Sequence, residues 1–266
     1  RGPITPNVRP VELFADADPG SVSHGIRFVR AASAWARAHR NEFDIAHVHS
    51  GFADYLLAAS RIRTRSGLPT VHTMYCPVPE HGGRWNRPGI KWLLHRSARR
   101  LDMLLAMSRN VADSMEAWGL PGVHVVPPAV DLERFKPGTD AAVREAIGLT
   151  PEHTVILFVG NATSQKNLTR VLDAFAGMQK KCEQARLVIT TELPRSSSRP
   201  DLQALRRQID ELGIEPLVVQ LGIIDNMPAI VRNADMLISP FMDSLGPSDY
   251  FVAAMEALAS GVPVIS

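Results

Sequence analysis

Short apolar runs alternate with longer stretches of helical periodicity along the whole chain. The runs are continuous, which indicates strands buried on both faces, as in a parallel sheet covered by helices. Nine strands are predicted, at residues 44–49, 69–73, 103–107, 123–126, 154–159, 186–190, 217–221, 236–239 and 262–265. Amphipathic helices are predicted between them, at residues 23–40, 54–66, 87–100, 108–118, 167–180, 201–212, 227–233 and 250–260. This alternation predicts an α/β fold with right-handed crossovers.

A change in composition divides the chain near its middle. Residues 126–138 read VPPAVDLERFKPG, and three prolines followed by a glycine predict a stiff, non-helical connector. The strand–helix rhythm restarts after it. We therefore place one Rossmann-like domain at residues 1–130 and a second at residues 131–266.

Composition excludes several classes of protein. The 266 residues are 45% hydrophobic and carry 29 Lys and Arg against 27 Asp and Glu, which excludes dominant disorder and gives no reason to expect a nucleic-acid partner. Two cysteines exclude a disulfide scaffold and fit a reducing compartment, so we expect a cytoplasmic protein. No apolar run approaches the ~20 residues that span a bilayer. The chain lacks an initiator Met and ends in an apolar run, so we expect truncation at both ends.

The common nucleotide and metal motifs are missing. The glycines form neither GxGxxG nor GxxxxGK[ST], and there is no HExxH or CxxC. Asp16 and Asp18 have DxD spacing, but their irregular, Pro- and Gly-flanked segment favours a solvated turn. His47 and His49 share a strand face and could join His72 around a metal, but a third ligand cannot be placed from sequence. We therefore predict no metal.

The loop after residue 159 has the composition of a phosphate site. A predicted buried strand runs into Gly160, and a short polar loop carries Lys166 to the start of a helix. Glycine allows a ligand to approach the backbone, and a helix N-terminus attracts anions through its unpaired N–H groups. Lysine adds a full positive charge. The alternative is an ordinary strand–helix loop with a surface lysine.

A second informative segment covers residues 239–266. A strand ends at Ser239, a loop follows, and Glu256 stands in the next helix among alanines and larger apolar residues. A carboxylate in such surroundings needs a buried partner. The alternative is that Glu256 lies on the solvent-facing stripe.

Together these segments resemble the donor-binding half of a GT-B glycosyltransferase of family 4. The sequence EALASGVPV (256–264) matches the end of the family signature, Lys166 matches its loop lysine, and residues 125–138 resemble its interdomain connector. Other stretches resemble successive elements of the acceptor-side domain, namely residues 43–51, 69–75 and 104–115. The resemblance implies two Rossmann-like, doubly wound parallel-sheet domains facing a cleft. Both domains would be incomplete: the first would lack its opening strand and Gly-rich loop, and the second would lack its closing helices.

The resemblance implies a retaining hexosyltransferase that moves a sugar from a nucleotide-diphosphate sugar to a glycan or lipid-linked acceptor. Such an enzyme serves cell-envelope polysaccharide synthesis and needs no separate cofactor. Lys166 would neutralise the leaving diphosphate, Glu256 would bind the ribose hydroxyls, and His72 would stand near the reacting sugar. The alternative is that His72 is a structural histidine at a strand end, with its hydrogen bonds made within the protein. The expected donor contacts besides Lys166 and Glu256 are Gly160, Asn161, Ser248, Asp249, Tyr250 and Phe251.

Two departures from the family pattern keep other functions open. Asn161 stands where the family has an arginine, and Ser248 stands where it has the first glutamate of its signature. A catalytically inactive sugar-nucleotide-binding homologue is therefore one alternative, and a GT-B-like nucleotide-sugar epimerase is another. The fragment by itself could lack activity whatever the parent protein does.

Residues 84–100 form a basic amphipathic segment. The sequence RWNRPGIKWLLHRSARR contains six Arg and Lys and no acid, with Trp and Leu interleaved. Such helices lie on anionic membrane surfaces, which indicates peripheral contact with the inner face of a membrane. The ordinary alternative, which we favour from sequence alone, is a surface helix whose Trp and Leu side chains belong to the core.

Overall fold

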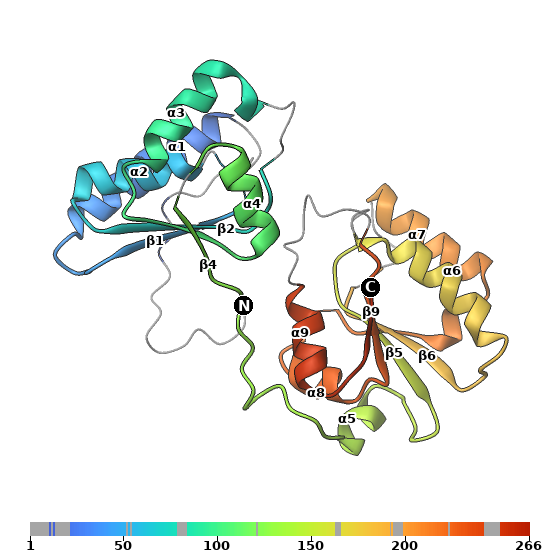
Figure 1. Ribbon diagram of the computed structural model, residues 1–266. Helices are drawn as coiled ribbons and strands as arrows, with labels where there is room; N and C mark the ends of the chain where they lie inside the picture. The colour runs from blue at the N-terminus through green and yellow to red at the C-terminus, as the bar shows by residue number, and fades with distance from the viewer. Residues whose placement is uncertain are drawn as a thin grey trace. The chain divides into compact units, whose positions relative to one another are not determined.

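The computed structural model (Figure 1) describes residues 11, 13, 22–51, 53, 55–78, 84–120, 122–162, 166–191, 193, 199–222, 224–241 and 251–266. They fall into two compact units, one extending to Pro128 and the other starting at Ala129. All nine predicted strands and all eight predicted helices are present, with ends within two residues of the predicted ones. None of the described helices combines the length and the apolar character needed to cross a membrane.

The first unit contains a four-stranded parallel sheet in the order β1-β2-β3-β4. Its strands are β1 (Ala46–Ser50), β2 (Thr70–Met74), β3 (Met103–Ala106) and β4 (Val123–Val125). Its helices are α1 (Val22–Ala38), α2 (Tyr55–Ser66), α3 (Pro88–Ala98) and α4 (Arg109–Ala117), with a 3-10 turn, η1 (Arg84–Asn86), before α3.

The described helices of the first unit pack on one face of its sheet. Buried side chains of α2, α3 and α4 form one core with Met74, Leu104 and Ala106. Strands added in one direction by right-handed crossovers place their helices on the same face, which explains the arrangement. His47 and His49 point to the other face and are exposed. The prediction that every strand is buried on both faces is therefore wrong for β1.

The second unit contains five parallel strands in the order β7-β6-β5-β8-β9. They are β5 (Thr154–Phe158), β6 (Ala185–Ile189), β7 (Val218–Gln220), β8 (Met236–Ile238) and β9 (Val264–Ile265). The helices are α5 (Ala141–Ala146), α6 (Leu168–Gln179), α7 (Pro200–Glu211), α8 (Met227–Arg232) and α9 (Val252–Ala259), with a 3-10 turn, η3 (Glu215–Leu217), before β7. The chain moves outward from β5 to β7 and then returns to the other side of β5.

This reversal covers both faces of the second sheet (Figure 1). Ile156 and Phe158 of β5 pack in one core with buried side chains of α6 and α7, while Val155 and Leu157 pack with α8 and α9. The sheet is therefore doubly wound, and its central strand is buried on both sides.

One helix was not predicted. α5 spans only six residues just after the Pro–Gly connector, and its side chains include none that is buried. The Asp140 side chain accepts a hydrogen bond from the Val143 N–H and so caps its first turn. A helix this short, without an apolar stripe, leaves little periodicity in the sequence to detect.

Candidate functional site

The site lies at the point where the second sheet reverses its winding. β5 stands between β6 and β8, so the loops after β5 and β8 leave the sheet toward opposite faces. In doubly wound sheets ligands bind at this point, beyond the carboxyl ends of the strands. Gly160 and Lys166 belong to the segment after β5, and Phe241 follows β8.

Gly160 is fixed by two threonines at the end of β6. Its N–H donates to the hydroxyl of Thr190 at 3.2 Å, and its carbonyl accepts from the hydroxyl of Thr191. A β-carbon at position 160 would lie 3.3 Å from Cδ of Lys166 and 3.4 Å from Cζ of Phe158. Glycine leaves room here for the aliphatic stem of the lysine, which lies close against the backbone.

The ammonium group of Lys166 lies against two aromatic rings. Its Nζ is 4.2 Å from the ring centroid of Phe241 and 4.1 Å from that of Phe251. The two rings meet edge to face, with centroids 4.9 Å apart. Such cation–π contacts stabilise a cation that has lost part of its hydration. Burial lowers the pKa of Lys166, and no carboxylate of the described residues forms an ion pair with it. Among the described residues, the charge is held in place and has no ion-pair partner.

The start of α6 adds hydrogen-bond donors beside this charge. Asn167 precedes the helix in a left-handed conformation, with φ of 54°, and its side chain makes no capping bond. The first N–H groups of a helix have no partner further along the helix, and the Asn167 side chain does not supply one, although the Asn167 carbonyl accepts a hydrogen bond from the Arg170 N–H. An unneutralised lysine next to such donors is suited to a phosphate group.

Glu256 lies on the helix that starts beside Lys166. Phe251, whose ring contacts the ammonium, directly precedes α9, and Glu256 is five residues further on, roughly 7.5 Å along the axis. Burial raises the pKa of Glu256, while the positive charge of Arg134 acts in the opposite direction. Ala253 and Ala257 beside it are buried, as their small size indicated. Glu256 itself is only half-buried.

The remaining donor-side predictions divide into two groups. Asn161 is exposed and Phe251 contacts Lys166. Ser248, Asp249 and Tyr250 lie outside the described residues.

His72 occupies a different environment from the predicted one. It is the third of the five residues of β2, not the last, and none of its surface is exposed. Its Nε2 shares a 2.8 Å hydrogen bond with the hydroxyl of Ser50, the last residue of β1. Its Nδ1 is buried without a partner among the described residues. Burial, aided by His47 and His49, lowers the pKa of His72 to about 4, so the imidazole is neutral at pH 7.

The exposed face of the same sheet carries a polar cluster. The rings of His47 and His49 lie 3.9 Å apart, His47 bonds to Thr73 at 2.7 Å, and His49 bonds to the hydroxyl of Tyr75. His72 points to the opposite face, so the three histidines do not converge. Within the part of the chain that the structure describes, no group of three or more potential ligands could hold a metal ion.

Two residues of the second unit were missed by sequence reasoning. Phe241 and Arg134 stand in segments that carried other motifs, and neither matched a chemical pattern. Phe241 matters because its ring contacts Lys166, 75 positions away in the chain. Arg134 matters because its positive charge lies near Glu256, 122 positions away. No local signal reports such a contact.

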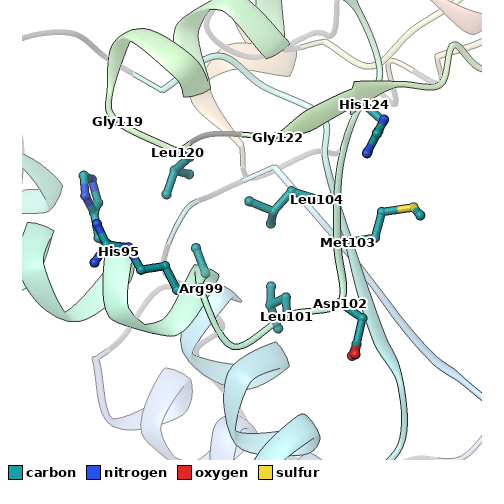
Figure 2. Close-up of a pocket in the computed structure, with 11 residues that line it drawn as sticks. His95, Arg99, Leu101, Asp102, Met103, Leu104, Gly119, Leu120, Gly122 and His124 are labelled. Carbon is teal, nitrogen blue, oxygen red and sulfur yellow. The ribbon is translucent and has the colours of Figure 1, made fainter.

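The first unit also contains a cavity of about 230 Å³ (Figure 2). It lies between the end of α3 and the starts of β3 and β4, and its lining includes His95, Arg99 and His124. Asp102 at its rim is bound to Arg63 and to the Thr70 N–H. The cavity is at the amino ends of the strands, opposite the edge where parallel sheets bind ligands, so we do not assign the site to it.

Comparison with known proteins gives two successive matches along the chain. Residues 3–134 match the model described as Glycosyltransferase Family 4, and residues 153–266 match the model described as Glycosyl transferases group 1.

Among curated proteins, the D-inositol 3-phosphate glycosyltransferase of Xylanimonas cellulosilytica is 30% identical over 99% of this chain and 66% of its own length. The mannosylfructose-phosphate synthase of Agrobacterium fabrum is 25% identical over 85% of this chain and 54% of its own length. The chain thus spans about half to two thirds of these relatives.

Among solved structures, HepE from Anabaena in complex with UDP-glucose has a TM-score of 0.69 at 18% identity, covering 88% of this chain and 62% of that one. Sucrose-phosphate synthase from Thermosynechococcus elongatus has a TM-score of 0.68 at 17% identity, covering 91% and 60%. At these identities the likeness concerns the fold.

Proposed function

The chain belongs to the family 4, group 1 glycosyltransferases of GT-B fold, and from this membership we propose that it transfers a hexose from a nucleotide-diphosphate sugar to an acceptor hydroxyl. The anomeric configuration is retained. The bond between the anomeric carbon and the leaving phosphate oxygen breaks, and a bond to the acceptor oxygen forms. The acceptor proton passes to the departing diphosphate. The reaction needs no separate cofactor.

The observation that carries this proposal is the environment of Lys166. As the glycosyl–phosphate bond breaks, negative charge accumulates on the diphosphate, and a fixed cation lowers the barrier most when it needs no rearrangement. Lys166 is already positioned by Gly160 and by the rings of Phe241 and Phe251. The start of α6, where the Asn167 side chain makes no capping bond, supplies further donors. Together these groups compensate for Asn161, which replaces the family's arginine.

Glu256 is assigned to the nucleoside end of the donor. A carboxylate accepts hydrogen bonds from two vicinal hydroxyls at once, which suits a ribose. Its position along α9 from Phe251 leaves room for a pyrophosphate between the two contacts. The remaining donor contacts assigned from the family pattern are Ser248, Asp249 and Tyr250.

His72 is assigned a positioning role on the acceptor side. The imidazole is fully buried, and its bond to Ser50 fixes the carboxyl end of β1, where an acceptor loop begins. His49 and Tyr75, hydrogen-bonded to each other near the ends of β1 and β2, are more accessible groups for an acceptor.

We further propose a glycan or lipid-linked acceptor, a role in cell-envelope polysaccharide synthesis and a cytoplasmic location at the inner face of the membrane. One relative is named for D-inositol 3-phosphate and another for mannosylfructose phosphate, so inositol phosphate and fructose phosphate belong in the acceptor panel.

The test uses the full-length protein with a panel of nucleotide sugars and acceptors, and measures release of nucleoside diphosphate. We expect release that requires an acceptor and is lost in Lys166→Ala and Glu256→Ala. Lys180→Ala, at the other end of α6, is the matched control and should keep wild-type activity.

Two other outcomes would overturn the proposal in different ways. Tight donor binding without turnover would identify an inactive sugar-nucleotide-binding homologue. Interconversion of the free nucleotide sugar without an acceptor would identify an epimerase.

A further inference from the structure

The basic helix α3 presents apolar side chains to solvent. Trp92 is 63% exposed, Leu93 is 42% exposed and Ile90 is 36% exposed. Leu94 on the same helix is completely buried. The interpretation that the Trp and Leu side chains of this segment belong to the core is therefore correct for Leu94 and for the partly buried Trp85, and wrong for Trp92 and Leu93.

The orientation of α3 follows from the side chains that it buries. Leu94, Ser97 and Ala98 are turned toward the core of the first unit, where α3 packs beside α2 (Figure 1). In a helix, residues three and four apart share a face, so Trp92 and Arg96 lie together on the outer side. An exposed tryptophan and leucine, side by side on a short helix, cost solvation energy unless something covers them.

The same outer side is strongly basic. Arg96, Arg99 and Arg100 are exposed, and the guanidinium of Arg96 lies 5.7 Å from the centroid of the Trp92 ring. Residues 84–100 contain no acid, and none of the ion pairs found among the described residues includes these three arginines. Their charges therefore face solvent without a neutralising partner in the described structure.

We propose that α3 docks the protein onto an anionic lipid bilayer, with Trp92 and Leu93 entering the interface and Arg96, Arg99 and Arg100 contacting lipid phosphates. Exposed apolar side chains beside arginines favour a lipid surface over a nucleic acid or an acidic protein, because arginines alone would be enough to bind those partners. Tryptophan prefers the headgroup level of a membrane, and long basic side chains reach phosphates while their stems lie in apolar surroundings.

This inference deepens the proposed location at a membrane but rests on the exposed surface of α3 and not on sugar transfer. Vesicle binding is measured without donor or acceptor, so either proposal can fail while the other stands.

The test is flotation of the full-length protein with vesicles of phosphatidylcholine alone and of phosphatidylcholine with phosphatidylglycerol. We expect binding only to the anionic vesicles, and weaker binding as salt is raised. Replacing Arg96, Arg99 or Arg100 singly with glutamine should weaken binding roughly fivefold. Trp92→Ala with Leu93→Ala should weaken it by roughly tenfold or more.

Matched controls separate a docking surface from general charge or stickiness. Arg37→Gln with Arg40→Gln removes two exposed charges near the end of α1 in the same unit, and Leu132→Ala removes a side chain that is 67% exposed in the second unit. Both should bind as the wild type does. Circular dichroism and thermal melting check that each variant is folded.

Several results would overturn the proposal. Equal binding to neutral and anionic vesicles would show that the arginines do not contribute to docking. No binding to either kind of vesicle would show that the protein does not dock on lipid. Binding unchanged in the α3 variants would place any contact elsewhere. Binding to an oligonucleotide duplex but not to vesicles would show that the basic face serves a nucleic acid.

Discussion

Replacing His72 with glutamine should remove much of the acid sensitivity of the first unit. Burial lowers the pKa of His72 from its ordinary value of 6.5 to about 4 in the folded protein. The unfolded chain therefore binds a proton between these values while the folded protein does not. Stability contributed by the neutral imidazole is complete above the unfolded-state pKa and is lost as the pH falls toward 4.

The magnitude follows from the size of that shift. Each pH unit inside this window costs about 1.4 kcal/mol, so a fall from about pH 7.5 to about pH 5 should remove roughly 2 kcal/mol of unfolding free energy through this one residue. The amide nitrogen of glutamine reaches the position of Nε2 and keeps a hydrogen bond to Ser50, but it does not titrate. His72→Gln should therefore lose roughly 2 kcal/mol less unfolding free energy than the wild type between these two pH values.

The assay is urea denaturation at both pH values, followed by tryptophan fluorescence. All four tryptophans, at positions 35, 85, 92 and 118, lie in the first unit, and Trp118 is buried. Fluorescence therefore reports unfolding of the unit that contains His72. The difference in pH dependence between the two proteins therefore reports the contribution of His72. An identical pH dependence in wild type and variant would refute the reasoning.

Three further outcomes are expected from single substitutions. Gly119→Ala should lower the free energy of unfolding of the first unit by roughly 2–3 kcal/mol in urea denaturation, because the φ of Gly119 is +101° and the added β-carbon would lie 2.8 Å from Cε1 of His95. Gly122→Ala, where φ is +73° and the β-carbon would enter open space, should cost only about 1 kcal/mol. An equal loss of unfolding free energy in the two variants would show that the His95 side chain moves aside without cost. Gly160→Ala should weaken donor binding roughly fivefold in calorimetry by displacing the loop lysine, with little change in melting temperature. Arg134→Gln should raise the pKa of Glu256 further, so that the pH below which donor affinity falls moves upward; a downward shift in the titration would contradict this assignment.

The sequence by itself determined the elements of this fold and the identity of its family. Apolar runs located every strand. They are continuous where a strand is buried on both faces, because such a strand has little freedom to carry polar residues, whereas β1 carries His47 and His49 on an exposed face. The helices followed from periodicity, except α5, which has no buried stripe. The segment EALASGVPV and the loop lysine indicated the glycosyltransferase family before any contact was known.

Only the tertiary structure decided which side of an element each residue occupies. A strand pattern does not show that His72 points into the core while His47 and His49 point away, since that depends on where the helices pack. Likewise the pattern of α3 does not distinguish an inward Trp from an outward one. The aromatic pair around Lys166 joins residues 75 and 85 positions away, and only the folded chain brings them together, because strand order, unlike strand location, is set by long-range packing.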